Sequence, residues 1–354
     1  MNATVTPMKP LHPVLDIVDL SISLPSGADR ALAVEGATLS VLPGQTLCVV
    51  GESGSGKSMI ANAVMGLLPR PHVAPVAGRI LFDGHDLLQL TEPQMRELRG
   101  RRIGMVFQEP MTALNPVMRI GEQIGEVFDA HGSVPAAEKR RRILAALADV
   151  GLPDPELLID AYPFRLSGGQ RQRVMIACAL VLEPVLLIAD EPTTALDVTT
   201  QAQILDLIRE LQAERGTAVI LITHDLGVVA ETADDIVVMY AARIAEHAPV
   251  FSLFERPMHP YTWGLLGSLP RLDVELERLT QIKGQPPSLL RPPAGCRFRP
   301  RCAHAFDRCR SELPEATPAG FDAGHLDACF LAEVRKLEES ARIVADLGLD
   351  EEAA

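Results

Sequence analysis

The sequence is poor in aromatic residues, in positive charge and in long apolar segments. Aromatic residues make up 4% of its 354 positions, yet hydrophobic residues make up 47%, which excludes a disordered chain. The formal net charge of −13 excludes a nucleic-acid binder held by general electrostatics. No apolar stretch reaches the ~18–20 residues that cross a bilayer, so any membrane process would need another chain for its membrane part.

Cysteine is scarce and widely spaced. The chain has six cysteines and no Cys-x-x-Cys pair, which disfavours a zinc ribbon. Cys48 and Cys178 lie in apolar runs, where we expect them to fill the core. The other four could be the thiolate ligands of an iron–sulfur cluster, a zinc site or structural cysteines. They lie in a region rich in proline and arginine, at Cys296, Cys302, Cys309 and Cys329.

Residues 51–58 have the pattern of a phosphate-binding loop. Its glycines let backbone N–H groups point into one concavity that holds phosphate oxygens. Lys57 would contact the β- and γ-phosphates, and Ser58 would offer its hydroxyl to Mg²⁺. An apolar run over 46–50 predicts a buried strand before the loop, and a helical pattern over 59–68 follows it. The alternative interpretation is a glycine-rich turn with a surface lysine and no bound ligand. The loop consists of Gly51, Glu52, Ser53, Gly54, Ser55, Gly56, Lys57 and Ser58.

A second apolar run, over 185–189, ends in two acids. Asp190 suits Mg²⁺ coordination, and Glu191 suits orienting and deprotonating a water for attack on the γ-phosphate. The alternative is an acidic pair in solvent at the end of a strand. The presence of the phosphate loop favours the catalytic interpretation, because such a loop needs an acidic partner.

A serine and two glycines precede a helical pattern near residue 170, which predicts a second anion site at a helix N-terminus. One nucleotide does not need two phosphate cradles on separate loops of one chain. The motif therefore predicts that the loop of one chain closes the nucleotide held by another. The alternative is an ordinary serine helix cap. The motif residues are Ser167, Gly168, Gly169 and Gln170.

Apolar strands alternate with helical segments along much of the chain, which predicts an α/β fold with a mainly parallel sheet and helices on its faces. A stretch with prolines and charged helical segments predicts a helical insertion. From about residue 257 the composition shifts to proline, arginine and cysteine, which indicates a second, irregular unit. The expected units are a flexible tail over 1–13, a main domain over 14–256 with its insertion at about 109–165, an extension over 257–335 and an acidic, helical tail over 336–354.

The ordered motifs resemble those of the nucleotide-binding subunit of ATP-binding-cassette (ABC) transporters, and the resemblance covers about residues 14–256. Three more motifs follow the family order: Gln108 within 106–110, Asp197 within 195–197, and His224 within 222–225. The resemblance implies a P-loop ATPase cassette of the α/β class, with an antiparallel β subdomain and a helical insertion. It also implies ATP hydrolysis with Mg²⁺.

The resemblance assigns a role to each of these residues. Gln108 would touch Mg²⁺ and the attacking water, His224 would contact the γ-phosphate, and Asp197 would cross the dimer interface. The alternatives are a strand-end glutamine in solvent, a core histidine and a helix N-terminal cap, respectively.

The resemblance also implies partners and a location. Two nucleotide-binding subunits would sandwich two ATP molecules head to tail, and the resemblance favours a paralogue as the second subunit. The helical insertion would grip two transmembrane permease subunits, which receive solute from an extracytoplasmic binding protein. The chain would be peripheral, on the cytoplasmic face of the bacterial cell membrane, with no nucleic-acid partner.

The region past 257 resembles the C-terminal extension of oligopeptide and dipeptide importer ATPases, on the motifs at 258–266, 284–287 and 295–302; residues 106–116 also resemble that group. This implies peptide import and a [4Fe–4S] cluster on the four clustered cysteines. Relatives with the same extension import nickel or other small solutes, so the solute stays open. A non-transport ABC ATPase and an exporter subunit are the competing interpretations.

One position departs from the family pattern. The family places an aromatic residue near the end of the first strand, where it stacks on adenine, but here only Leu24 is available. No Tyr, Phe or Trp lies between Met1 and Phe82. We therefore expect looser base selectivity, with GTP competing better than is usual for the family.

Overall fold

The computed structural model describes residues 12–25, 27–28, 31–109, 113–194, 196–269, 282–287 and 292–348. Several predicted features lie outside these ranges: most of the tail over 1–13, residues 110–112 and 195 of two motifs, and the acidic end over 349–354. Of the helices in the described ranges, none has the length and apolar character that crossing a membrane requires.

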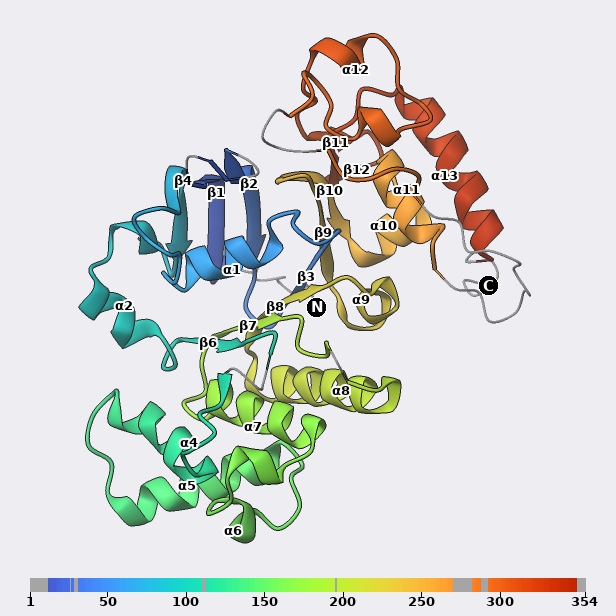
Figure 1. The fold of residues 1–354 in the computed structure, drawn as a ribbon. Coiled ribbons are helices and arrows are strands. Elements are labelled where there is room, and N and C mark those ends of the chain that lie inside the picture. The colour runs from blue at the N-terminus through green and yellow to red at the C-terminus, as the bar shows by residue number, and fades with distance from the viewer. Residues whose placement is uncertain are drawn as a thin grey trace, which may run out of the picture.

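Two sheets organise the molecule (Figure 1). The smaller is antiparallel and has the strand order β2-β1-β4-β5. Its strands alternate buried and exposed side chains, as expected for a sheet with one face on the core. The strands are β1 (Leu15–Ser23), β2 (Leu32–Val41), β4 (Ala74–Phe82) and β5 (His85–Asp86).

The larger sheet has the strand order β11-β12-β10-β9-β3-β8-β7-β6. The strands from β9 to β6 are parallel, and β10, β12 and β11 continue the sheet in antiparallel pairs. The α/β fold predicted from the sequence is confirmed. The strands are β3 (Thr46–Val50), β6 (Ile103–Val106), β7 (Leu186–Asp190), β8 (Ala218–Thr223), β9 (Asp235–Tyr240), β10 (Arg243–Pro249), β11 (Thr317–Ala319) and β12 (Asp322–Asp327).

Helices cover the larger sheet and fill the segments between its strands. In the first half of the chain they are α1 (Lys57–Val64), η1 (Leu87–Gln89), α2 (Glu92–Leu98), α4 (Ile120–Asp129), α5 (Ala136–Asp149), α6 (Pro155–Leu158), η2 (Pro163–Arg165) and α7 (Gly168–Leu180). In the second half they are α8 (Val198–Arg215), α9 (Leu226–Thr232), α10 (Val250–Glu255), α11 (Pro260–Leu266), η3 (Arg299–Arg301), α12 (Arg308–Ser311) and α13 (Glu333–Leu347).

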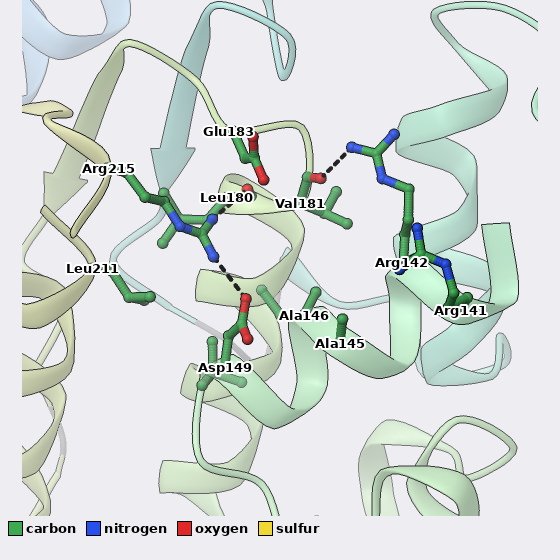
Figure 2. Close-up of a pocket in the computed structure, with 12 residues that line it drawn as sticks. Arg141, Arg142, Ala145, Ala146, Asp149, Leu180, Val181, Glu183, Leu211 and Arg215 are labelled. Carbon is green, nitrogen blue, oxygen red and sulfur yellow. Dashed lines mark hydrogen bonds and ion pairs between the residues drawn. The ribbon is translucent and has the colours of Figure 1, made fainter. Parts of the chain in front are cut away.

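Arginine side chains hold α5, which lies within the predicted insertion, against α7 and α8 (Figure 2). Arg215 of α8 pairs with Asp149 of α5 at 2.7 Å and donates to the carbonyl oxygen of Leu180 at 3.2 Å. Arg142 of α5 donates to the carbonyl oxygen of Val181 at 3.3 Å. The pocket between these helices is lined by no residue of the predicted nucleotide motifs, so we assign its arginines to helix packing.

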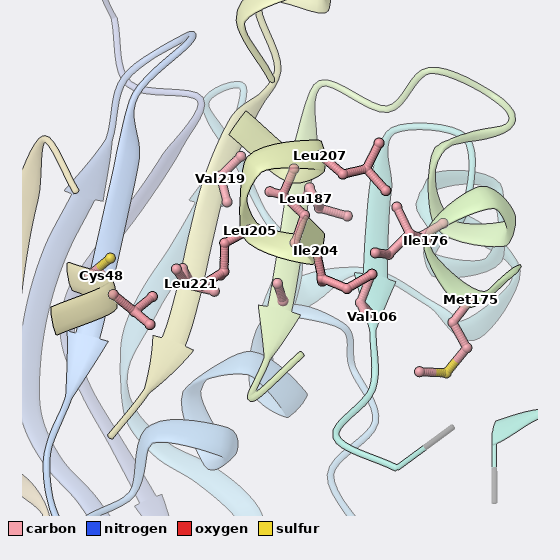
Figure 3. Packing of buried hydrophobic residues seen from close by; sticks show 14 of the residues in the cluster. Cys48, Val106, Met175, Ile176, Leu187, Ile204, Leu205, Leu207, Val219 and Leu221 are labelled. Carbon is pink, nitrogen blue, oxygen red and sulfur yellow. The ribbon is translucent and has the colours of Figure 1, made fainter. Parts of the chain in front are cut away.

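The strands of the parallel region are buried on both faces, which explains their nearly continuous apolar sequences. On β3, Cys48 and Val50 pack toward one hydrophobic cluster, and Leu47 and Val49 pack toward the other. Figure 3 shows Cys48 beside Leu221 of β8 in the first cluster, which α7 and α8 complete. The core positions predicted for Cys48 and Cys178 are confirmed, since Cys178 packs against the same cluster.

The C-terminal extension continues the larger sheet and is more regular than its sequence indicated. Strand β12 pairs with β10, and α13 packs on α10 and α11. The fully buried carboxylate of Glu246 on β10 accepts hydrogen bonds from His325 Nε2 on β12 (2.7 Å) and from the N–H groups of Met258 (2.6 Å) and His259 (3.0 Å). These bonds compensate the burial of its charge.

Candidate functional site

The phosphate loop lies between β3 and α1, and two of its glycines are required by close backbone contacts. Gly51 has φ of +148°, and a Cβ there would lie 2.1 Å from the carbonyl oxygen of Met239. Gly56 has φ of +110°, and a Cβ there would lie 2.5 Å from the carbonyl oxygen of Ala33. The buried hydroxyl of Ser55 has no hydrogen-bond partner among the described residues. A loop with this backbone and an unpaired buried donor fits a phosphate ligand.

Lys57 is nearly buried and lies along the inner side of the loop. Its Nζ donates to the carbonyl oxygen of Gly51 at 2.6 Å and to that of Glu52 at 3.2 Å. Burial lowers the pKa of Lys57, and the nearby carboxylates of Glu191, Asp190 and Glu52 oppose that shift. The ammonium group is therefore held where phosphate charge would be bound.

Ser58 and Asp190 meet at the carboxyl ends of the parallel strands, where β3 and β7 both terminate. The Ser58 hydroxyl donates to Asp190 Oδ1 at 3.0 Å. Burial raises the pKa of Asp190, Glu191 raises it further, and the Ser58 hydrogen bond opposes the shift. A hydroxyl and a carboxylate side by side are oxygen donors of the kind that Mg²⁺ prefers, so these two residues fit a Mg²⁺ site.

One oxygen atom of Glu191 lies close to two of the predicted motif side chains, Gln108 and His224, and to Thr194. Glu191 Oε2 accepts from Gln108 Nε2 at 3.1 Å and from Thr194 Oγ1 at 2.9 Å, and His224 Nδ1 lies 3.8 Å away. Glu191 has φ of +47°, a left-handed conformation that is costly for this residue type, and its N–H donates to the carbonyl oxygen of Ile222. The His224 side chain is 68% exposed, which excludes the core-histidine alternative.

The two remaining motifs, which contain Ser167 and Asp197, form helix caps and make no contact with Glu191 among the hydrogen bonds described above. Ser167 caps α7, with its hydroxyl accepting from the Gln170 N–H at 3.3 Å, and Asp197 caps α8, accepting from the Thr200 N–H at 2.9 Å. Ser167, Gly168 and Asp197 are exposed. In Figure 1, α7 lies well away from α1, so this chain does not bring its own Ser167 to its own phosphate loop. The cap alternative holds for both residues within the single chain.

Three of the four cysteines of the extension have contacts that place them: the Cys296 N–H donates to the carbonyl oxygen of Cys309 at 3.0 Å, and Cys296 and Cys302 both pack against the first hydrophobic cluster. Burial raises the pKa of Cys302 to about 11 and that of Cys329 to about 12. Within the described part of the chain, no group of three or more His, Cys, Asp or Glu is arranged to hold a metal ion. The structure therefore gives no support to the predicted iron–sulfur cluster.

Comparison with known proteins identifies the family. A family model described as "ABC transporter" matches residues 34–194, and one described as "Oligopeptide/dipeptide transporter, C-terminal region" matches residues 245–309. The dipeptide transport ATP-binding protein DppD of Bacillus subtilis is 47% identical over 92% of this chain and 96% of its own length. The chain belongs to the ABC transporter ATP-binding proteins. The oligopeptide transport ATP-binding protein OppD of Escherichia coli, 47% identical over 90% of this chain and 93% of its own length, is another relative of this ABC ATPase.

Solved ABC cassettes share its fold. The ATP-binding cassette MJ0796, in a dimeric post-hydrolysis state bound to ADP and phosphate, superposes with a TM-score of 0.60 at 28% identity, over 67% of this chain and 98% of that one. CbiO1 of Clostridium perfringens gives a TM-score of 0.58 at 31% identity, over 68% of this chain and 90% of that one. The predicted P-loop ATPase cassette is confirmed, and the protein is an ATPase that uses ATP and Mg²⁺.

Sequence reasoning missed three residues that touch the motifs of this ABC ATPase. Thr194 lies three positions after Glu191 and donates a hydrogen bond to it. Its place in the turn that follows the strand could have suggested this contact. Tyr261 and Arg301 of the extension bond Glu52 of the phosphate loop. They are separated from Glu52 by 209 and 249 positions, so no local sequence pattern could have found them.

Proposed function

We propose that this chain is the ATP-hydrolysing subunit of an importer that drives uptake of dipeptides and oligopeptides across the cytoplasmic membrane. The observation that carries the proposal is that the similarity extends beyond the cassette. It includes the region matched by the oligopeptide/dipeptide C-terminal model, and the relatives named for dipeptide and oligopeptide transport are similar over most of both chains.

In this proposal the residues around Glu191 carry out hydrolysis. The phosphate loop and Lys57 hold the β- and γ-phosphates of ATP, and Ser58 and Asp190 hold Mg²⁺. When bound, Mg²⁺ neutralises charge that develops on the phosphate oxygens. Glu191 accepts a proton from the attacking water, whose oxygen bonds to the γ-phosphorus as the bond to ADP breaks.

Gln108 and His224 act on the same reaction from either side of Glu191. Gln108 orients the water and would help to hold Mg²⁺ when it is bound, and His224 donates to the γ-phosphate. The 3.1 Å contact of Gln108 and the 3.8 Å separation of His224, both to one Glu191 oxygen, support these roles, because they bring the three side chains to one place.

The site is completed by a second subunit in this proposal. The exposed N-terminus of α7, with Ser167, Gly168, Gly169 and Gln170, closes the nucleotide of the partner, and Asp197 crosses the interface. A paralogue is the preferred partner. The insertion helices contact two permease subunits, an extracytoplasmic binding protein delivers the solute, and the subunit sits peripherally on the cytoplasmic face of the membrane.

Glu191→Gln tests the catalytic part. The variant keeps the shape of the side chain but cannot accept the proton, so hydrolysis should fall at least about 100-fold while ATP still binds. Size exclusion of the variant mixed with its partner subunit and MgATP should then reveal a trapped dimer. Glu210→Gln, at an exposed position on α8, is the matched control and should hydrolyse normally. A Glu191→Gln variant with the wild-type rate would remove Glu191 from the mechanism.

Uptake tests the transport part. Co-expressed with its permease and binding protein in cells that lack peptide uptake, the chain should restore accumulation of a labelled tripeptide. The Glu191→Gln variant should not. Restoration of nickel uptake alone would contradict the peptide assignment and leave the ATPase assignment intact.

The [4Fe–4S] cluster stays a prediction from the sequence, and no step above depends on it. Its basis is the resemblance of the extension and the four cysteines in the sequence; among the described residues, no group of three or more His, Cys, Asp or Glu is arranged to hold a metal ion. Absorption in the visible range by anaerobically purified protein, lost in a Cys302→Ser variant, is the expected signature. Colourless protein without bound iron would overturn the prediction.

A further inference from the structure

The extension contacts the phosphate loop at Glu52, the second residue of the loop. The Glu52 N–H donates to Tyr261 Oη on α11 at 3.0 Å, and Arg301 Nη1 on η3 donates to Glu52 Oε2 at 2.8 Å. The Arg301 side chain is 4% exposed and the Glu52 side chain 27% exposed, so the ion pair is partly shielded from solvent. Shielding of this kind makes an ion pair worth more than one on an open surface.

The backbone group held by Tyr261 is also the one that holds Lys57. The N–H of Glu52 and the carbonyl of Gly51 belong to a single peptide unit. Lys57 Nζ donates to that carbonyl at 2.6 Å, and Tyr261 accepts from the N–H on the opposite side. Because the unit is planar, its orientation fixes both ends at once. Tyr261 therefore helps set the position of the Lys57 ammonium group.

The groups that hold Glu52 are themselves fixed by the extension. Tyr261 is fully buried and packs against the rings of Tyr240 and Phe298, with centroids 4.6 and 5.5 Å away. Arg301 also donates to the carbonyl oxygens of Lys283 (3.1 Å) and Ile282 (3.2 Å). These contacts already restrict both side chains, so each loses little conformational entropy when it bonds the phosphate loop.

We propose that Tyr261 and Arg301 are positioning residues of the nucleotide site, which hold the 51–52 peptide and Glu52 in the conformation that receives the phosphates of ATP. The inference rests on the proposed function of the phosphate loop. It makes the extension part of the ATPase, and not only an attachment to the cassette.

The test uses the purified full-length chain and measures MgATP affinity by calorimetry, together with KM and kcat. Tyr261→Phe removes one hydrogen bond and keeps the ring, so the Kd should rise about fivefold. Arg301→Met and Glu52→Gln should raise the Kd about five- to tenfold, with KM changed more than kcat. Arg299→Met is the matched control from the same turn, since Arg299 donates to the carbonyl oxygens of Ala294 and Arg310, and its Kd should stay within about twofold.

A double-variant cycle separates positioning from general destabilisation. If Arg301 acts through Glu52, the pair Glu52→Gln with Arg301→Met should bind MgATP no more weakly than Arg301→Met alone. Multiplying effects would overturn the inference, as would unchanged affinity in all three single variants. Glu52→Gln lies at a partly exposed position, so it keeps the test decisive even if a change at Arg301 impairs folding.

Two further measurements complete the design. By reciprocity, MgATP should slow amide hydrogen exchange over residues 296–302 in the wild type, and Glu52→Gln should remove that protection. Lys57→Ala distinguishes a failure of the proposed nucleotide site from a failure of the proposed role of the extension. Wild-type affinity in Lys57→Ala would overturn the nucleotide site itself, whereas loss of affinity there, with unchanged Tyr261→Phe and Arg301→Met, would overturn only the role of the extension.

Discussion

The N-termini of α1 and α7 both belong to nucleotide motifs, but they are built differently. α1 begins after Gly56, which has φ of +110° and no side-chain cap. α7 begins after Ser167, whose hydroxyl and the Gln170 side chain form a reciprocal capping box. The first helix start leaves its N–H groups to a ligand, whereas the second satisfies part of its own hydrogen-bonding capacity within the chain.

The difference shows how far a single chain prepares each half of the proposed shared site. The loop before α1 holds buried Lys57 against its own carbonyl groups and brings Ser58 to Asp190. The start of α7 is exposed and forms its capping box within the chain, which fits the proposal that a partner subunit contacts it. The four predictions below test this contrast, from the largest expected effect to the smallest.

Gly56→Ala should abolish ATP binding. The new Cβ would lie 2.5 Å from the Ala33 carbonyl oxygen at a backbone angle that side chains rarely adopt. Strain and overpacking together cost about 4 kcal/mol, or about 1,000-fold in Kd. Calorimetry measures the loss. Gly216→Ala is the control, since Gly216 also has positive φ but no heavy atom lies within 4 Å of its Cβ position. Equal losses in both variants would show that the effect is not local to the loop.

Asp190→Asn should lower ATP hydrolysis but raise the thermal stability of the fold. MgATP hydrolysis should fall about 100-fold, because the Mg²⁺ ligand is lost. Burial raises the pKa of Asp190, so the folded state favours the protonated carboxyl. Its contribution to stability is full below the unfolded pKa and is lost as the pH rises through the folded pKa.

The Asn variant should therefore have a higher Tm than the wild type at neutral pH without Mg²⁺, and that gain should disappear below the ordinary pKa range of aspartate. Thermal unfolding across pH measures it. A lower Tm at neutral pH would mean that the ionised carboxylate stabilises the fold.

Ser167→Ala should leave the affinity of the isolated chain for ATP unchanged and lower hydrolysis by the dimer about tenfold, because in the proposed dimer the hydroxyl acts on the nucleotide of the partner. Loss of the cap itself costs about 1 kcal/mol of stability. Thr91→Ala, which removes the capping box of α2, is matched for that loss and should hydrolyse normally. Steady-state assays at saturating ATP distinguish the two, and an equal drop in both would reduce Ser167 to a helix cap.

Leu24→Tyr should give the smallest effect, a gain of at most about fivefold in preference for ATP over GTP. Leu24 packs against the core cluster of the antiparallel sheet, and the wild type should accept GTP as a good competitor. Competition binding with both nucleotides checks this. A wild type that already prefers ATP strongly would mean that another group recognises adenine.

The parts predictable from the sequence were those encoded by short-range patterns. The strands β3 and β7 are buried on both faces, so their continuous apolar runs could be recognised from the sequence alone. The acids that follow the apolar run of β7 could be placed at the end of that strand for the same reason. The Ser58–Asp190 pair was predictable because parallel strands end at a common edge.

The long-range contacts were not predictable. The pairing of β12 with β10 joins segments about 80 residues apart, and the extension has neither a strand-like apolar run nor a turn signal strong enough to reveal it. The bonds from Tyr261 and Arg301 to Glu52 depend on that packing. The four cysteines of the extension could be grouped from the sequence, but the described residues do not form a metal-binding group there, so the predicted cluster has no structural support.

The buried carboxylate of Glu246 has a practical consequence for work with shorter fragments. A chain truncated near residue 256 would lose the His325, Met258 and His259 donors, and β10 would lose its pairing with β12. The exposed edge of β10 would then be free to pair with other chains, which favours aggregation. Chimaeras that replace the extension should therefore exchange β10 together with everything that follows it, so that these contacts are kept.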